Sequence, residues 1–184
     1  SVGEIWTSKY TGNKDGFYSM TYGNDKYVTV GTSSGLLNII NSPDGINWTS
    51  VTNSINRYHL YQIIYAENLF ISVGYAGLIV TSSDGDNWTL QTSGTNKSLV
   101  SIVYGDNLFV AVGSSGTVIT SRDGTSWESQ TSITSNSLIG VTYGNGKYVA
   151  VGSSGTIISS SDGINWTSHS SGTTEEFKRV AYAE

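Results

Sequence analysis

The stretch SPDGINWTS at residues 42–50 returns almost unchanged as SSDGINWTS at residues 160–168. Two looser copies, SSDGDNWTL and SRDGTSWES, lie between them. The tryptophans of the four copies are separated by 40, 39 and 39 residues, and four tyrosines, Tyr65, Tyr104, Tyr143 and Tyr182, recur in steps of 39. The chain is therefore built from a repeat of about 39 residues, and such a period is the first guide to its fold.

Each repeat contains four short strand signals separated by turn residues. In the copy LIGVTYGNGKYVAVGSSGTIISSSDGINWTS, residues 138–168, the first run is apolar, the next two are rich in Val and Ile, and the fourth carries Trp166. Gly, Asn and Asp between the runs tolerate the positive φ of tight turns. The predicted fold is all-β, a β-propeller of four-stranded antiparallel blades. A β-solenoid with a long period is the alternative.

The repeats divide the chain, as one domain of residues 1–184, into four complete blades and a remainder at each terminus. The four blades are expected at residues 17–52, 60–92, 99–131 and 138–169. FKRVAY at 177–182 resembles a further inner strand, and EIWTS at 4–8, within the segment 1–16, resembles a further outer strand. We therefore predict five blades, with a slim fifth blade built from both termini. A fragment of a larger ring and an open arc that closes by self-association are the alternatives.

The repeated nonapeptide is interpreted as a structural turn, not as a catalytic motif. The aspartate carboxylate can accept backbone N–H bonds across the turn, and the tryptophan nearby can insert a large ring between sheets. The residues assigned this role are Asp44 with Trp48, Asp84 with Trp88, Asp123 with Trp127, and Asp162 with Trp166.

At these residues the sequence resembles the Asp-box (BNR-like) propellers, whose repeats occur in sialidases, sortilin-like receptors and Ycf48-like photosystem assembly factors. The resemblance covers nearly the whole chain, because Val-Gly, Gly-x-x-Gly and Asp-Gly-x-x-Trp recur in the same order. The usual box is Ser-x-Asp-x-Gly-x-Thr-Trp, whereas here Gly follows Asp directly and the motif is one residue shorter. The resemblance implies boxes on the outer rim, away from a central ligand face.

Composition narrows the classes of partner. The net charge is -5, and the nine Lys and Arg residues form no cluster that could follow a phosphate backbone, so no nucleic-acid partner is expected. Cysteine is absent and the apolar runs are short, which predicts a soluble protein with neither disulfides nor membrane insertion. His59 and His169 occupy unrelated repeat positions, so no metal site and no cofactor are predicted. Ser at position 1 suggests a processed product or a domain of something longer.

The candidate ligand-binding residues are those at which the repeats differ near the expected central face. One aligned position holds Ser19, Gln62, Ser101, Gly140 and Arg179, and the position before it holds Tyr18, Tyr61, Val100, Ile139 and Lys178. The second repeat is the most divergent. Its aromatic and polar residues, together with Arg179, form the predicted set: Arg57, Tyr58, His59, Tyr61, Gln62, Tyr75 and Arg179.

No catalytic residue is assigned. A glycosidase needs two carboxylates at a defined separation, and Glu175 and Glu176 are the only pair expected near the channel. We therefore expect a non-catalytic recognition module, extracellular or on a cell or virion surface, that binds a glycan or a protein. The alternative is an assembly or scaffolding propeller that binds a protein partner, and a glycoside hydrolase is the less favoured reading.

Overall fold

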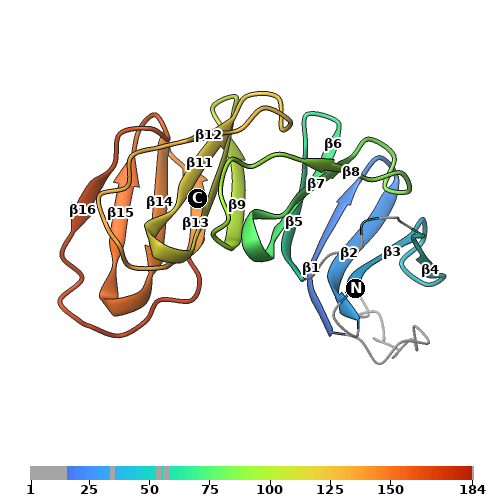
Figure 1. The fold of residues 1–184 in the computed structure, drawn as a ribbon, viewed down its shortest axis with the longest axis horizontal. Coiled ribbons are helices and arrows are strands. Elements are labelled where there is room, and N and C mark those ends of the chain that lie inside the picture. Colours follow the sequence, from blue (N-terminus) through green and yellow to red (C-terminus); the bar gives the residue numbers. More distant parts are fainter. Residues whose placement is uncertain (1–15, 34–35, 53–54, 56–58, 184) are drawn as a thin grey trace, which may run out of the picture.

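The computed structural model describes residues 16–33, 36–52, 55 and 59–183. These residues form sixteen β-strands and three short 3-10 turns, arranged in four sheets (Figure 1). The all-β prediction is confirmed. Residues 4–8, expected to form an extra outer strand, lie outside the described residues.

Each sheet is one blade of four antiparallel strands in chain order. Blade 1 comprises β1 (Gly16–Gly23), β2 (Lys26–Ser33), β3 (Leu36–Ser42) and β4 (Thr49–Ser50). Blade 2 comprises β5 (Leu60–Ala66), β6 (Leu69–Gly74), β7 (Ile79–Ser82) and β8 (Thr89–Gln91). Blade 3 comprises β9 (Leu99–Gly105), β10 (Leu108–Gly113), β11 (Val118–Ser121) and β12 (Glu128–Ser129). Blade 4 comprises β13 (Leu138–Gly144), β14 (Lys147–Gly152), β15 (Ile157–Ser160) and β16 (Thr167–His169).

The four blades form an open arch (Figure 1). The outer strands β4 and β16 lie at opposite ends of the view, and the inner strands β1 and β13 of the same blades lie toward its middle. The two end blades therefore extend in opposite directions from a common centre. This radial arrangement is that of a propeller and not of a solenoid, in which sheets stack along one axis.

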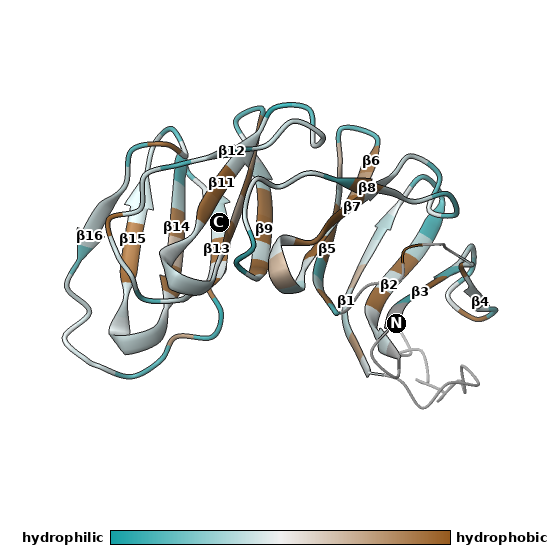
Figure 2. Ribbon diagram, in the orientation of Figure 1, coloured by the Kyte–Doolittle hydropathy of each residue, from teal (hydrophilic) through white to brown (hydrophobic). Residues whose placement is uncertain are grey.

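The core lies between the blades. Apolar residues concentrate on the strands and polar residues on the turns (Figure 2). Between blades 1 and 2, Val28 and Ile39 pack with Ile63 and Phe70, all buried. Corresponding clusters join blade 2 to blade 3 and blade 3 to blade 4. Each sheet therefore buries one face against each neighbouring blade.

The Gly-x-x-Gly segments form the 3-10 turns η1 (Tyr75–Gly77), η2 (Ser114–Gly116) and η3 (Ser153–Gly155). Gly77 has φ +76°, and a Cβ there would overlap the carbonyl oxygen of Thr95 on the segment leading to the next blade. Glycine is needed at this place for both reasons, the backbone angle and the close approach. In blades 2, 3 and 4 the turn thus anchors the blade to the connection that follows it.

The repeated nonapeptides form the turns between the third and fourth strands. In blade 1 the Asp44 carboxylate Oδ1 accepts the backbone N–H groups of Ile46 and Asn47, both at 2.8 Å. These donors hold the pKa of Asp44 well below its usual range. The indole Nε1 of Trp48 donates to the carbonyl oxygen of Gly45 at 3.2 Å. The same bonds recur at Asp84, Asp123 and Asp162.

Residues 177–183 form no strand, although FKRVAY was predicted as an inner strand. A strand needs a hydrogen-bonded ladder with a neighbour, and no second strand of a fifth blade is present among the described residues. The segment nevertheless lies on blade 4, where Phe177 N–H donates to the carbonyl oxygen of Gly152 at 3.0 Å.

Candidate functional site

A β-bulge interrupts the inner strand of every described blade. In β1, Phe17 pairs with Gly31 and Ser19 with Val30, so Tyr18 between them has no partner in the ladder. The same register shift leaves Tyr61, Val100 and Ile139 unpaired in β5, β9 and β13. A bulge re-aims the side chain of the extra residue. The structure therefore offers one redirected side chain per blade.

The redirected side chains meet on the concave side of the arch. They line a cavity of about 610 Å³, which also takes in the residues that follow each bulge and part of the C-terminal segment. The lining residues that occupy the two aligned repeat positions are Tyr18, Ser19, Tyr61, Gln62, Val100, Ser101, Ile139, Gly140, Lys178 and Arg179. Both aligned positions singled out from the sequence thus lie in one cavity. The bulge itself was not foreseen, because it depends on the pairing between strands.

The second of these positions joins neighbouring blades. The hydroxyl of Ser19 accepts the Ile63 N–H at 3.2 Å, the side-chain oxygen of Gln62 accepts the Ile102 N–H at 2.9 Å, and the hydroxyl of Ser101 accepts the Val141 N–H at 3.1 Å. Inner strands of different blades share no ladder, so these side chains satisfy backbone donors that would otherwise lack a partner. Gln62, predicted as a ligand contact, therefore has its oxygen engaged in the fold.

Aromatic rings gather at one end of the cavity. The rings of Tyr18 and Tyr61 have centroids 6.2 Å apart, and Tyr18 is half exposed. Burial raises the pKa of Tyr61, and the phenols of Tyr18 and Tyr75 raise it further. Tyr61 is therefore neutral near pH 7 and can donate a hydrogen bond as well as offer a ring face.

Basic side chains stand at the other end. Lys178 and Arg179 are exposed and come from the C-terminal segment, beside Glu176. Among the lining residues that the structure describes, Glu176 is the one carboxylate. The aliphatic Val100 and Ile139 lie on the intervening strands. The cavity thus passes from aromatic through aliphatic to basic along the arch.

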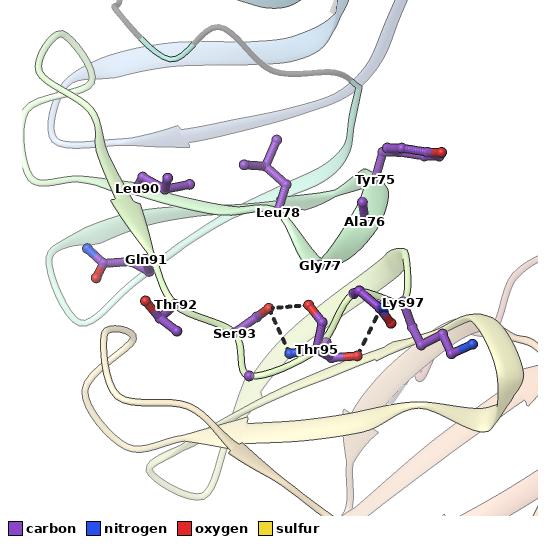
Figure 3. Close-up of a pocket in the computed structure, with 12 residues that line it drawn as sticks. Tyr75, Ala76, Gly77, Leu78, Leu90, Gln91, Thr92, Ser93, Thr95 and Lys97 are labelled. Atoms are coloured by element: carbon purple, nitrogen blue, oxygen red, sulfur yellow. Dashed lines mark hydrogen bonds between the residues drawn. The ribbon is translucent and has the colours of Figure 1, made fainter.

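His59 and Tyr75 do not line this cavity. The ring of His59 is parallel to that of Tyr61, with centroids 6.4 Å apart, and meets Tyr75 edge-on. Tyr75 borders a second pocket of about 660 Å³, beside η1 and the connection from β8 to β9 (Figure 3). Arg57 and Tyr58, also predicted as ligand contacts, lie outside the described residues.

Part of the polar lining of the second pocket is engaged in the fold. The hydroxyl of Ser93 donates to the carbonyl oxygen of Thr95 at 3.1 Å, and the Lys97 N–H donates to the Thr95 hydroxyl at 3.1 Å (Figure 3). Figure 3 also shows the ring of Tyr75 directed away from Leu90. Ser93 and Thr95 thus hold the connection between blades, whereas the central cavity gathers the positions at which the repeats differ and is the better candidate site.

The described residues show neither a metal site nor a membrane span. Nowhere among them do three or more acidic or histidine side chains gather closely enough to hold a metal ion. In the same part of the chain, no helix is long and apolar enough to cross a bilayer.

Comparison with solved structures identifies the architecture. The chain resembles Ycf48 bound to a D1 peptide, with TM-score 0.63, 16% identity, and coverage of 91% of this chain and 56% of that chain. It resembles Ycf48 from Cyanidioschyzon merolae with TM-score 0.69, 18% identity, and coverage of 92% and 61%. The fold is that of a β-propeller.

A third similar structure is virginiamycin B lyase from Staphylococcus aureus, with TM-score 0.73, 11% identity, and coverage of 84% of this chain and 55% of that chain. The chain therefore spans between 55% and 61% of the length of these propellers. Neither a known protein family nor a curated protein matches it. At these identities the likeness establishes the fold alone.

Proposed function

We propose that this protein is a non-catalytic binding module whose central cavity holds an extended segment of a protein partner. The observation that carries the proposal is the convergence of four bulged residues, Tyr18, Tyr61, Val100 and Ile139, on one concave face. These positions are equivalent in the repeat and yet carry different side chains. The variation gives one end of the face two rings and its middle two aliphatic side chains, and such a lining can distinguish between ligands.

The chemistry of the cavity fits a peptide. An apolar side chain can lie against the rings of Tyr18 and Tyr61, and a carboxylate can pair with Lys178 and Arg179. A ligand that contacts both the aromatic end and the basic end of the cavity needs an apolar group and an acidic group separated along its length, as in an extended chain. Similarity in fold to a Ycf48 structure that holds a D1 peptide supports a peptide ligand.

A glycan is the second candidate. The exposed ring of Tyr18 beside Tyr61 is the feature that favours it, since such rings stack on the apolar faces of sugars.

A hydrolase is less well supported. The single carboxylate of Glu176 among the described lining residues lacks the second acid that glycoside cleavage needs.

The decisive experiment exposes the purified 184-residue protein to a random-sequence peptide array and a glycan array in parallel. We expect a coherent set of bound peptides that combine an apolar residue with an acidic one. Tyr61→Ala and Lys178→Ala should each weaken binding by roughly tenfold or more, as expected for contacts central to an interface.

Matched controls separate the cavity from the rest of the surface. Tyr75→Ala removes an exposed ring that borders the second pocket, and Lys147→Ala removes an exposed ammonium group from the β13–β14 hairpin. Both variants should bind like the original protein. If glycans bind instead of peptides, and Tyr61→Ala weakens that binding, the protein is a lectin. Turnover of a glycoside that Glu176→Gln abolishes would contradict the non-catalytic proposal.

A further inference from the structure

One position on the inner strands makes the same hydrogen bond at three successive joints between blades. Its side chain accepts a backbone N–H from a fixed place on the inner strand of the next blade. The acceptors are Ser19, Gln62 and Ser101, and the donors are Ile63, Ile102 and Val141. The donors are one repeat of 39 residues apart, so the next residue in their series is Val180.

At the fourth place in this series the acceptor is missing. Gly140 stands on β13 where Ser101 stands on β9, and it has no side chain. The C-terminal segment lies beside β13 (Figure 1), and a Cβ on Gly140 would lie 3.3 Å from the backbone nitrogen of Val180. Among the residues that the structure describes, none accepts a hydrogen bond from the Val180 N–H. A backbone N–H is a strong donor, so this one is left for solvent or for a ligand.

The unfilled place belongs to the basic end of the central cavity. Gly140 and Val180 both line that cavity. Lys178 and Arg179, which come just before Val180 in the chain, line it as well and are exposed. In the part of the chain that the structure describes, neither basic side chain forms an ion pair, with Glu176 or with any other carboxylate. One short segment therefore brings a backbone N–H and two cationic side chains to the cavity, and no carboxylate of the described chain pairs with them.

We propose that this place binds a carboxylate of the peptide ligand, and that one carboxylate oxygen accepts the Val180 N–H as a side-chain oxygen does at the other three joints. The inference rests on the proposed function and names the place where the acidic group of the peptide binds. Lys178 and Arg179 supply the opposite charge, and a hydrogen bond to an ionised acceptor is about twice as strong as one between neutral groups. Gly140 sets the specificity, because a side chain there would occupy the place of the ligand oxygen.

The test follows the backbone amide signal of Val180 by NMR while small carboxylates are added into the millimolar range. The first probe is N-acetyl-aspartic acid α-amide, which carries a side-chain carboxylate and no charged terminus. The second is N-acetyl-alanine, which carries only a terminal carboxylate, so the two probes distinguish the two sources of the acidic group. We expect a saturable shift centred on Val180 with at least one of them. N-acetyl-alanine amide is uncharged and should leave the Val180 signal unchanged.

Variants of the protein test the assigned contacts. Gly140→Ser supplies the missing hydroxyl from within the chain and should weaken binding of the carboxylate probe by about tenfold, as loss of a hydrogen bond to a charged group does. Lys178→Gln and Arg179→Gln leave the place open but remove a charge from an exposed side chain, so they should fold normally and weaken binding severalfold. Lys147→Gln, on the exposed β13–β14 hairpin, is the matched control and should bind like the original protein.

A peptide from the array ties this place to the proposed function. Gly140→Ser should weaken binding of the acidic peptide, and should have no effect on the same peptide with its acidic group removed, because the two changes act on one contact.

The outcomes separate this inference from the proposed function. Peptide binding with no response of the Val180 amide, or an equal loss by Gly140→Ser for both peptides, would overturn the carboxylate site and leave the peptide-binding proposal standing. A Val180 response to the small carboxylates in a protein that binds no peptide would support the carboxylate site and contradict the proposed function. Shifts at Lys178 and Arg179 alone would also overturn the inference, since they would show charge pairing without the backbone contact.

Discussion

The ring of Tyr182 packs directly on the backbone of Gly144, so closely that a Cβ on Gly144 would overlap it. The same relationship joins Tyr65 to Gly23 and Tyr143 to Gly105. In those pairs the tyrosine belongs to the inner strand of one blade and the glycine to the inner strand of the blade before it. Tyr182 therefore lies on blade 4 as the start of a further blade would, although residues 177–183 form no strand.

The first prediction compares two of these glycines. Gly105→Ala forces the Tyr143 ring to move within the packed interface between blades 3 and 4, at a cost of about 1–3 kcal/mol of unfolding free energy. Gly144→Ala displaces Tyr182, which is 47% exposed and lies near the end of the chain. It should leave global stability nearly unchanged and hasten proteolysis of residues 177–183. Urea unfolding and limited proteolysis of both variants check this, and equal losses of stability would contradict it.

The second prediction concerns the side chains that join inner strands. Ser101→Ala removes the acceptor of the buried Val141 N–H and leaves that donor without a partner. An unsatisfied buried donor costs about 1–3 kcal/mol. Chemical denaturation should show that loss. Ser98→Ala, next to β9, removes a bond to the exposed N–H of Ala76 and a side-chain bond to the partly buried Tyr61, so it should cost less.

Gly140 provides the reverse experiment. It occupies the position of Ser101 in the next blade, and a Cβ there would lie 3.3 Å from the backbone N of Val180. Gly140→Ser thus offers Val180 the acceptor that Val141 already has. We expect slower amide exchange at Val180, measured by hydrogen exchange and NMR. Faster exchange there would mean that the added side chain pushes the C-terminal segment away.

The sequence predicted the blades well because their determinants are local. Turn residues and alternating apolar residues recur in every repeat, and the spacing of Trp48, Trp88 and their equivalents sets the blade period. The candidate site was predicted only in part. Aligning repeats brought Tyr18 and Tyr61 together, but the bulge that turns them inward depends on the register between two strands.

Two residues, Gln62 and Tyr75, show where the sequence argument did not distinguish roles. Gln62 diverges from its equivalents and yet makes the same bond between blades as Ser19 and Ser101, because an amide oxygen and a hydroxyl can both accept the N–H. Divergence at that position therefore does not by itself indicate a ligand contact. Tyr75 follows Gly74 into η1, which carries its ring toward a different pocket from the one that Tyr61 lines.

The third prediction concerns acid stability. The side-chain amide and backbone N–H of Asn165, with the backbone N–H of Ile164, hold the pKa of Asp162 well below its usual range, and the three equivalent aspartates are held low in the same way. A carboxylate whose pKa is lower in the folded state stabilises the fold above its unfolded pKa, near 3.9, and this contribution is lost as pH falls below that value. The thermal midpoint should therefore fall steeply below about pH 4.

Asp162→Asn isolates one of these contributions. The asparagine side chain keeps an oxygen that can accept the N–H groups of Ile164 and Asn165 but carries no charge. We expect a lower midpoint at pH 7 and a shallower decline between pH 5 and pH 2 than in the original protein. Thermal scans across that range provide the measurement. Parallel curves for the two proteins would show that the Asp162 carboxylate does not contribute to the acid transition.

The fourth prediction concerns the hydroxyl of Tyr148, which donates to the carbonyl oxygen of Gly105 across the interface between blades 3 and 4. Phe70 and Phe109 occupy the same repeat position without a hydroxyl and are fully buried. Tyr148→Phe should therefore fold normally and lose no more than about 1 kcal/mol at neutral pH, the net value of one hydrogen bond.

The same substitution should improve stability in alkali. Burial raises the pKa of Tyr148 to about 12, with smaller contributions from neighbouring phenols and carboxylates. The folded state thus favours the neutral phenol, so the stability that it contributes is fully present below the unfolded pKa, near 10, and is lost as pH rises toward 12. Tyr148→Phe removes this titration and should shift alkaline unfolding to higher pH. Tyr27→Phe is the control, because Tyr27 occupies the equivalent position on blade 1 and is exposed. This variant should unfold at the same alkaline pH as the original protein. If Tyr148→Phe also unfolds at the original pH, some other group governs the alkaline transition.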